Sequence, residues 1–484
     1  MNFWNFSSEH PPMGLKWRSN TNFIIATVAI GLFTDLFLYG LVVPILPFML
    51  RDRIDLPQDK VQSYTSGLLA AYAGASVVFS IPAGWIADKT GARQTPFLAG
   101  LAALLGATIL LGVGQSIAVL VVARILQGIS AAVVWTVGLA MVLDTVGSEN
   151  LGKVIGSIFS FISIGELLAP VLGGVLYDKT GYGGVFGVGS AILGIDFIMR
   201  ALVIEKKVAR RYEKDTEESH SHSFRDIASP HDSDEEEASE RTGLLPKKEE
   251  KMESYKIPIE TQSRVVRAVP ILYCLRNPRL LVALLLAFVQ ACLLATFDAT
   301  IPTQADSLFN FSSLNSGLLF IALDIPYLLL GPVAGWAVDK YGTKYPAVFG
   351  FGYLVPVLIL LRLPGEEFVG DKPGNIALYC GLLALCGVGM AVIGSPAIVE
   401  ASAVIQDYDK ANPDLFGENG PYAQLYSFNS LVFSLGLTMG PIISGTLRDS
   451  IGYGNMNIVL AVVVGLTAVA AFVFVGGSIG KRSS

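Results

Sequence analysis

The recurrence of apolar runs long enough to cross a lipid bilayer constrains this chain most. A membrane-spanning helix needs about 20 consecutive, mostly apolar residues. Six such runs precede a charged segment, over residues 23–49, 65–87, 96–115, 117–143, 153–176 and 183–204. Six more follow it, over residues 279–302, 314–338, 345–363, 376–404, 421–447 and 456–477. We therefore predict an all-α membrane protein that crosses the bilayer twelve times and keeps both termini on one side.

The amino-acid composition excludes a soluble domain and a nucleic-acid-binding protein. Hydrophobic residues make up 52% of the 484 residues and charged residues only 15%, far from the balance of a protein folded in water. The net charge of −6 comes with no basic patch that could follow a phosphate backbone. Because the polar N-terminus lacks the pattern of a cleavable signal peptide, we expect the first apolar run to remain as a helix.

The positions of basic residues predict the orientation in the membrane. Lysine and arginine are enriched in cytoplasmic loops, and here Lys89, Arg93, Lys340 and Lys344 lie in short loops on the same side as both termini. We therefore expect cytoplasmic termini. The predicted segments are a cytoplasmic N-terminal tail, a six-helix bundle, a disordered cytoplasmic loop, a second six-helix bundle and a cytoplasmic C-terminal tail, over residues 1–22, 23–204, 205–268, 269–477 and 478–484.

Two short motifs outside the apolar runs bear on sorting and modification. The loop over 205–268 is rich in charged residues and poor in aromatic ones, so it cannot bury enough surface to fold. In this loop, Glu240 precedes Leu244 and Leu245 with the spacing of acidic dileucine signals that sorting adaptors read, a spacing that chance also produces. Asn310 heads an Asn-Phe-Ser glycosylation acceptor in the predicted outer loop after the seventh run.

An internal repeat appears first in the loops after the second and eighth apolar runs. The first copy reads Gly84-Trp-Ile-Ala-Asp88-Lys89-Thr-Gly91-Ala-Arg93. The second copy, at an offset of 251 residues, reads Gly335-Trp-Ala-Val-Asp339-Lys340-Tyr-Gly342-Thr-Lys344. Glycine permits tight turns and close helix approach, and each aspartate can accept from a helix N-terminus or pair with a basic side chain.

A second repeat, at an offset of 271 residues, lies in the fifth and eleventh runs. The positions of Gly156, Gly165, Ala169-Pro170 and Gly173-Gly174 recur as Ser427, Gly436, Gly440-Pro441 and Ser444-Gly445. Small residues at four-residue intervals form a stripe for close helix contact, and Pro170 adds a kink. Two parallel six-helix repeats, with a binding site between them near the midplane, are typical of alternating-access transporters.

These motifs resemble those of the major facilitator superfamily, and the resemblance covers the chain outside its tails and central loop. It implies a latch that closes one face of the protein, formed by Gly84, Asp88, Gly91, Arg93, Gly335, Asp339, Gly342 and Lys344. It also implies an antiporter motif formed by Gly156, Gly165, Pro170, Gly173, Gly174, Gly436, Gly440 and Pro441. The chain departs from that motif at Ala169, where the superfamily has glycine.

Arg124, in the sequence Arg124-Ile-Leu-Gln127-Gly128 of the fourth run, resembles another motif of the superfamily. That resemblance implies a buried arginine that couples proton movement to substrate binding. Because an intramembrane charge costs about 2.5–3.5 kcal/mol on insertion scales, we expect a partner or water beside it. The alternative is that Arg124 extends to the outer interface.

Carboxylates inside the apolar runs are candidates for proton and substrate binding, because each is costly there unless it is used. Asp35 and Asp298, each followed by prolines, resemble acidic sites of the vesicular monoamine and acetylcholine transporters, although Asp298 could instead only line the entrance. Glu166 lies within the glycine stripe, and Glu400 could replace the acid that those carriers have in the tenth helix. Further candidate contacts for an amphipathic substrate are Tyr39, Trp135, Gln290, Tyr327 and Asn429.

Other polar residues set this chain apart from those carriers. Where they have a lysine in the second helix and an aspartate in the eleventh, this chain has Ala73 and Ser430, which argues against a monoamine substrate. Asp196 and Arg200, four residues apart in the sixth run, are interpreted as a neutralised structural pair.

We predict a proton-coupled antiporter that exports or sequesters drugs, amines or secondary metabolites by alternating access, driven by the proton gradient without a cofactor or bound metal. Its partners would be the lipid bilayer, a small organic substrate, protons and sorting adaptors, and we expect a monomer in the plasma membrane or in a vacuolar or vesicular membrane. The alternatives are a uniporter or symporter for a nutrient and a non-transporting sensor with this fold. An enzyme is not expected, since no nucleophile elbow, phosphate loop or metal-ligand cluster appears.

Overall fold

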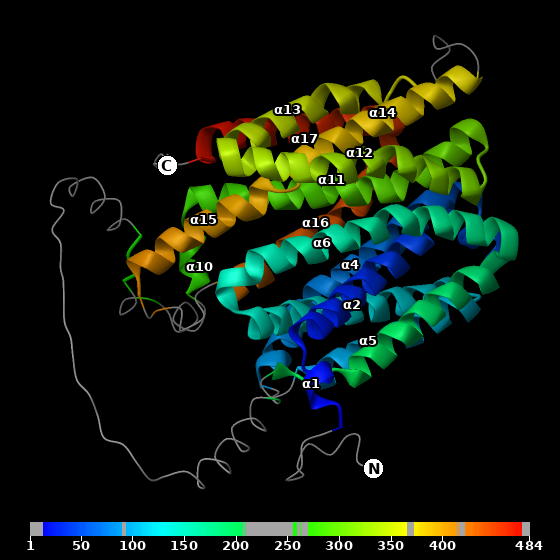
Figure 1. Ribbon diagram of the computed structural model, residues 1–484. Helices are drawn as coiled ribbons and strands as arrows, with labels where there is room; N and C mark the ends of the chain where they lie inside the picture. The colour runs from blue at the N-terminus through cyan, green and yellow to red at the C-terminus, as the bar shows by residue number, and fades with distance from the viewer. Residues whose placement is uncertain are drawn as a thin grey trace, which may run out of the picture.

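The computed structural model describes residues 13–89, 93–206, 209, 255–258, 262, 270–364, 372–413, 415 and 422–476. Every regular element in these residues is a helix (Figure 1). The first half contains α1 (Leu15–Arg18), α2 (Thr21–Val42), η1 (Val43–Ile45), α3 (Leu46–Asp52), α4 (Gln58–Lys89), α5 (Gln94–Val113) and α6 (Ile117–Leu202). The second half contains α10 (Ile271–Cys274), α11 (Pro278–Phe309), α12 (Ser313–Tyr341), α13 (Lys344–Leu360), α14 (Lys372–Ile393), α15 (Pro396–Ala411), α16 (Tyr422–Ile451) and α17 (Tyr453–Phe474).

The helix α6 is much too long for a single crossing. Its 86 residues would extend about 130 Å as a straight helix, whereas the hydrocarbon core is about 30 Å thick. Figure 1 shows that this part of the chain folds back on itself, and Gly181 within it has the positive φ of 63° that glycine permits. Helix α6 contains two candidate spans. Ile117–Val146 is long enough for one crossing, and the 42 residues of Phe161–Leu202 are long enough for two.

Twelve crossings account for the described helices. Ten helical stretches are long and apolar enough to span a membrane, and one of them is the double-length Phe161–Leu202. The apolar α13, Lys344–Leu360, is a shorter additional span. The predicted all-α membrane fold is therefore confirmed, with differences at the helix ends. The seventh crossing, predicted over 279–302, continues to Phe309, and the tenth is divided at Gly394 into α14 and α15.

Local sequence explains where several helices begin and bend. Asn20 and Asn277 cap α2 and α11 by accepting from the backbone N–H two residues ahead, at 2.9 and 3.0 Å. In the first crossing, Pro44 cannot donate a backbone hydrogen bond, and the helix tightens there into the three-residue η1 before α3 continues.

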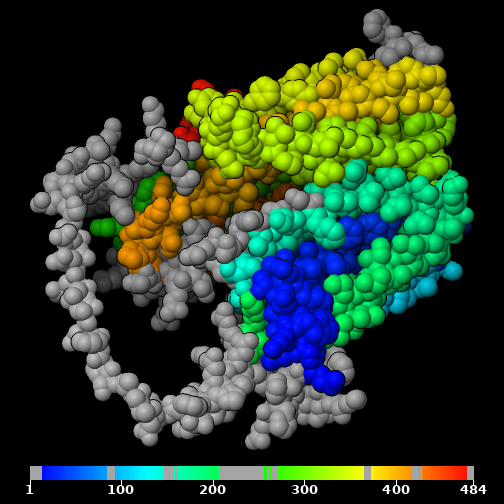
Figure 2. Space-filling model, viewed as in Figure 1, coloured from blue at the N-terminus to red at the C-terminus, as the bar shows by residue number. Residues whose placement is uncertain are grey.

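The helices form two bundles that lie side by side, with the first half of the chain in one and the second half in the other (Figure 1). We name the side on which α2 begins and α17 ends the terminal side, and the opposite side the distal side. Figure 2 shows the two bundles in contact along their distal parts, at the right of the view. The apolar core is shared, because buried side chains of both bundles belong to one cluster.

The glycine stripes pack each bundle in the same way. A Cβ atom at Gly165 would lie 2.6 Å from the Phe33 ring of α2, and one at Gly440 would lie 2.5 Å from the Cys292 carbonyl oxygen of α11. The Cys292 oxygen belongs to the backbone and cannot move aside, so only glycine fits at Gly440, whereas the Phe33 ring would have to shift to admit a side chain at Gly165. The stripe of the fifth crossing therefore packs on the first helix of its bundle, and that of the eleventh on the seventh. The sequence repeat is thus also a repeat of helix contacts.

Candidate functional site

Asp35 lies on α2 in the interior of the first bundle and is only 1% exposed. Its Oδ2 atom accepts hydrogen bonds from the Tyr72 hydroxyl of α4 at 3.2 Å and from the Trp135 Nε1 of α6 at 3.0 Å. The buried Oδ1 atom has no hydrogen-bond partner among the described residues. Two aromatic donors thus orient the carboxyl group and leave one oxygen to hold a proton or a cation.

Tyr39 connects this group to the second bundle. It lies one helical turn after Asp35 on α2, and its ring packs on Tyr72 at a centroid distance of 4.9 Å. The Tyr39 hydroxyl donates to Oδ2 of Asp298 on α11 at 3.0 Å. The two aspartates identified from the sequence therefore face a common polar region where the two bundles meet.

Two further acids extend this region, one from each bundle. Glu166 on α6 and Asp324 on α12 lie close enough to Asp298 to interact with it electrostatically, and Asp324 and Glu166 also interact with each other. Tyr327, one turn after Asp324 on α12, interacts with both Glu166 and Asp324. We name Asp35, Glu166, Asp298 and Asp324 the central acids. They come from both bundles, so movement of one bundle against the other changes the site.

Arg124 lies on α6, is fully buried and is close to the ring of Tyr39. Its NH1 donates to Gln127 Oε1 at 3.0 Å, and its Cζ lies 6.0 Å from the centroid of the Tyr39 ring, within the range of a cation–π contact. The Nε and NH2 atoms have no hydrogen-bond partner in the described part of the chain. The cation therefore lies within the bundle, close to the aromatic residues that orient Asp35 and Asp298.

Glu400 lies far from the central acids, at the terminal end of the second bundle. Its carboxylate, 1% exposed, forms an ion pair with Arg279 at the start of α11, and it accepts from the Thr343 hydroxyl and from the Gly476 backbone N–H at 3.0 Å. Arg279 precedes Asp298 by 19 residues, about 28 Å along a helix. The structure thus places Glu400 where it joins α11, α15 and the segments that follow α12 and α17.

Gln290 and Asn429, the two remaining candidates for substrate contact, lie on the second bundle. In the described structure, neither forms a hydrogen bond to the central acids. Gln290 is buried on α11, where its Nε2 would lie 3.8 Å from a Cβ atom at Gly394, the break between α14 and α15. Asn429 is half-buried on α16. Trp135, by contrast, contacts Asp35 directly, as described above.

A polar network joins the bundles at the distal side. Arg448 of α16 donates to Gln62 of α4, to the Thr303 hydroxyl of α11 at 2.7 Å and to Gln304 at 3.1 Å. Gln62 also donates to the Ala299 carbonyl oxygen at 3.1 Å. We name Gln62, Thr303, Gln304 and Arg448 the distal network. The distal network therefore joins the two bundles by direct hydrogen bonds on the distal side of the central acids.

On the distal side, the bundles are also in contact through a second polar cluster and through close approaches at two glycines. Arg51 pairs with Asp306 at 3.2 Å, and Gln58 donates to the same carboxylate at 3.1 Å. A Cβ atom at Gly174 would lie 2.5 Å from the Ser313 carbonyl oxygen, and one at Gly445 would lie 2.5 Å from the Ser66 hydroxyl. These two glycines occupy equivalent positions of the repeat, so each glycine motif also forms part of the contact between the bundles.

The latch motif lies on the terminal side and is described in part. In the second copy, Gly342 has φ +84°, Asp339 is exposed, and the Lys344 Nζ lies 4.7 Å from the Phe472 ring centroid. A Cβ atom at Gly335 would meet nothing within 4 Å. In the first copy, Arg93 pairs with Asp144 at 3.1 Å. For four other motif residues the structure describes at most the backbone, and one of them, Gly91, lies outside the described residues: Gly84, Asp88, Gly91 and Gly156.

The predicted sorting residues Glu240, Leu244 and Leu245 also lie outside the described residues. The predicted glycosylation site lies within them. Asn310 is exposed, has a left-handed φ of 52° and ends α11 on the distal side. Only three residues separate α11 from α12, so this asparagine lies in a tight surface turn.

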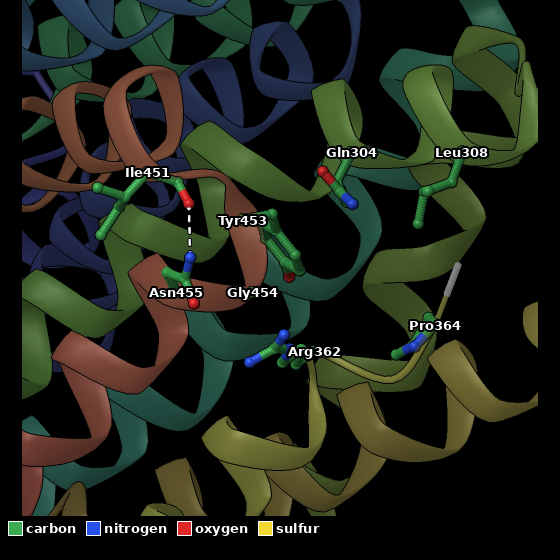
Figure 3. Close-up of a pocket in the computed structure, with 8 residues that line it drawn as sticks. All are labelled: Gln304, Leu308, Arg362, Pro364, Ile451, Tyr453, Gly454 and Asn455. Atoms are coloured by element: carbon green, nitrogen blue, oxygen red, sulfur yellow. Dashed lines mark hydrogen bonds between the residues drawn. The ribbon is translucent and has the colours of Figure 1, made fainter. Parts of the chain in front are cut away.

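A cavity of about 290 Å³ lies on the distal side of the second bundle, apart from the central acids (Figure 3). Figure 3 shows Tyr453 and Arg362 pointing toward each other across it, with Gln304 at its edge. Its lining residues are Gln304, Leu308, Arg362, Pro364, Ile451, Tyr453, Gly454 and Asn455. All eight belong to the second half of the chain, and Gln304 is also part of the distal network, so the cavity borders the contact between the bundles without residues of the first bundle in its lining.

The fold and the site between its halves define a multi-pass membrane transporter. The chain belongs to the Major Facilitator Superfamily, whose sequence profile matches residues 28–411. This membership confirms the family resemblance stated from the loop and helix motifs. The protein is a transporter and not an enzyme.

The comparisons with individual proteins agree with this assignment. The chain is 51% identical over 477 residues to the MFS-type transporter ppzB of Metarhizium rileyi, covering 96% of this chain and 97% of that protein. It is 22% identical over 481 residues to the vesicular acetylcholine transporter of Tetronarce californica, covering 92% and 79%. Among solved structures, a D-xylose–proton symporter superposes with a TM-score of 0.64 at 14% identity, covering 94% of this chain and 98% of that one. At that identity the likeness concerns the fold alone.

Tyr72 and the distal network are functional candidates that sequence reasoning missed. Tyr72 is adjacent to Ala73, the position compared with the lysine of the vesicular carriers, but its own hydroxyl is the group that reaches Asp35. Gln62 and Arg448 stand 386 positions apart in the chain. A polar residue at a helix end is common, and nothing in the sequence indicates that these two meet.

Proposed function

We propose that this transporter exchanges protons for small organic cations, among them amphipathic drugs, amines or secondary metabolites. The observation that carries the proposal is the set of central acids, supplied by both bundles and surrounded by aromatic side chains. Ionised carboxylates are costly inside a membrane protein. A bound proton or a bound organic cation each removes that cost, so the two compete for the same groups.

The aromatic residues support an organic cation as the substrate. Tyr39, Tyr72, Trp135 and Tyr327 lie next to the central acids. Aromatic faces attract ammonium groups, with an energy of about 0.5–2 kcal/mol each, while the carboxylates fix the position of the charge. The distant relationship to a transporter of acetylcholine, itself an organic cation, agrees with this substrate class.

Alternating access would couple the exchange to movement of the bundles. With the distal network formed, the central acids would communicate with the terminal side. Breaking the distal network and the Tyr39–Asp298 hydrogen bond would let the bundles part on the distal side, and contacts at the latch would close the terminal side. A substrate with differential affinity for the two states then shifts the equilibrium between them.

The orientation and location follow the basic loops. We propose that the terminal side faces the cytoplasm, so that residues 205–268 would be cytoplasmic and Asn310 would face the outside or the lumen, where it could carry a glycan. A plasma membrane or a vacuolar or vesicular membrane fits this arrangement, and the dileucine at Leu244 would act in sorting. Protease access to the central loop in sealed vesicles of known sidedness tests the orientation.

Uptake into sealed vesicles tests the transport mechanism. Purified protein is reconstituted, an inside-acid gradient is imposed, and a panel of amphipathic amines and drugs is supplied. We expect accumulation that requires the gradient, fails in Asp35→Asn and persists in Asp178→Asn, which neutralises an exposed acid of α6. Accumulation that does not respond to collapse of the proton gradient would instead indicate a uniporter.

A further inference from the structure

Asp196 and Arg200 form an unusual buried arrangement in the first bundle. Both lie on α6 with 0% of their side chains exposed. In the described part of the chain, neither oxygen of Asp196 and none of the three guanidinium nitrogens of Arg200 has a hydrogen-bond partner, and no ion pair joins the two. The guanidinium instead lies 3.7 Å from the centroid of the Phe97 ring of α5. The two residues, interpreted from the sequence as a neutralised structural pair, interact electrostatically but share no hydrogen bond in the described part of the chain.

Asp196 lies close to the helix that carries Asp35. A Cβ atom at Gly31 of α2 would lie 3.6 Å from Oδ1 of Asp196. Gly31 precedes Asp35 by four residues, which is one turn and about 6 Å along the helix. Because α2 begins on the terminal side, Asp196 lies between Asp35 and that side. The lack of a side chain at Gly31 leaves room beside α2 for the Phe97 ring, at 2.7 Å from such a Cβ atom, and for this carboxyl group.

Polar groups continue from this pair to the terminal end of the bundle. The Arg200 carbonyl oxygen accepts from Gln94 Nε2 at 3.1 Å, and the Gln94 backbone N–H donates to Glu205 Oε1 at 2.6 Å. Glu205 follows the end of α6 and interacts electrostatically with Arg200. Burial raises the pKa of Glu205 above its usual value. The charged group that faces Asp196 is therefore Arg200 on its own helix, with Glu205 beyond it, and Asp35 lies one turn further along α2 from Gly31.

We propose that Asp196 is a second proton-binding carboxyl group of this transporter, on the path between Asp35 and the terminal side. A proton leaves the Asp35 carboxyl group, is carried by internal water to the Asp196 carboxylate, and then passes to water on the terminal side. Asp35 becomes ionised in the first step, and Asp196 becomes ionised again in the second.

The geometry allows Asp196 to change its protonation. A buried carboxylate without hydrogen bonds carries a desolvation cost, which a bound proton removes. Arg200 interacts with Asp196 electrostatically and offsets part of the same cost when the proton has left. A purely structural aspartate would instead be held in one state by direct hydrogen bonds, and Asp196 has none in the described part of the chain.

Infrared difference spectra of the purified full-length protein test the proposal directly. Protonated carboxyl groups absorb in a region free of other protein bands, so spectra taken across a pH titration report which acids take up protons. We expect one titrating band to disappear in Asp196→Asn and to remain in Asp178→Asn, the exposed control on the same helix. In Asp196→Glu the same band should shift in position. Spectra of Asp196→Asn and Asp196→Glu that match the wild type would overturn the proposal.

A transport assay then separates a proton carrier from a structural residue. The proposal rests on proton coupling, so its transport readout compares two modes in the same vesicles, using an amphipathic amine that the wild type transports. In Asp196→Asn, uptake driven by an imposed proton gradient should fall to the level of empty vesicles, while exchange at equal pH continues. Equal retention of both modes would contradict the proposal. If the wild type shows no gradient-driven uptake, the proposed function fails, whereas the infrared test of Asp196 still applies.

Discussion

The Tyr39 hydroxyl donates to Oδ2 of Asp298 across the junction of the two bundles, at 3.0 Å and over 259 positions of sequence. Tyr39 also packs on Tyr72, whose hydroxyl donates to Asp35. The two aspartates are thus linked through two tyrosines, one carboxyl group in each bundle. A change in the charge of Asp298 alters a bond that holds the bundles together. In the proposed mechanism, binding at the central acids and movement of the bundles are therefore physically connected.

Replacing Tyr39 by phenylalanine removes this hydrogen bond and keeps the ring. A hydrogen bond to a charged group contributes about 1.5–3 kcal/mol, so we expect Tyr39→Phe to favour separation of the bundles by at least about tenfold. Energy transfer between dyes attached at the distal ends of the two bundles measures the two populations. An unchanged distribution in Tyr39→Phe would show that this bond does not control the movement.

Loss of the distal network should also open the distal side. Arg448→Gln removes the guanidinium that donates to Gln62, Thr303 and Gln304, and the shorter, uncharged amide cannot replace all three contacts, so we expect a larger shift toward the distal-open state than in Tyr39→Phe. The same dye pair reports it. Lys60→Gln is the matched control, since it removes a positive charge from an exposed distal residue. A shift of equal size in Lys60→Gln would attribute the effect to net charge instead.

The glycine stripe predicts a stability difference between two substitutions of the same kind. At Gly440 a Cβ atom would lie 2.5 Å from the Cys292 carbonyl oxygen, whereas at Gly381 it would meet nothing within 4 Å. Overpacking costs about 1–3 kcal/mol, and alanine in an open helical position is better than glycine by about 0.5–1 kcal/mol. Gly440→Ala should therefore lower the thermal unfolding temperature and Gly381→Ala should not. Equal temperatures would mean that α11 and α16 are less closely packed than described.

Glu400 is predicted to stabilise the second bundle without binding substrate. Glu400→Gln leaves Arg279 without its ionic partner, and removing one member of a buried ion pair costs about 3–5 kcal/mol. We expect a lower unfolding temperature and an unchanged affinity for a transported amine, measured by equilibrium binding to the purified protein. The opposite pattern, normal stability with lost binding, would support the substrate-binding role predicted from the sequence.

Much of the fold was predictable because it depends on the lengths of the apolar runs and on the repeated sequence motifs. Apolar runs of spanning length predicted the crossings, and the duplicated glycine motifs predicted two similar bundles, because close helix contact tolerates little else at Gly436 and Gly440. The positions of side chains around each helix were less accessible. These helices are apolar on all sides, so no polar face indicates that Tyr72 points to Asp35.

The placement of Glu400 shows a second limit of the sequence. Comparison with the vesicular carriers placed it near a substrate-binding acid, but the break at Gly394 separates α14 from α15 and leaves Glu400 on the second of these helices, beside Arg279. The distance between Glu400 and the central acids depends on this break and on contacts with α11. No local sequence pattern predicts either of them. The distal network likewise depends on tertiary contacts alone.

Proton release on substrate binding tests the central claim most directly. The purified protein in weakly buffered solution, with a pH indicator dye, is mixed with an amphipathic amine that it transports. If protons and organic cations compete for the central acids, binding should release protons, and Asp35→Asn should release fewer than Asp178→Asn. Binding of the amine with no proton release at any pH between the wild type's limits of stability would contradict the account.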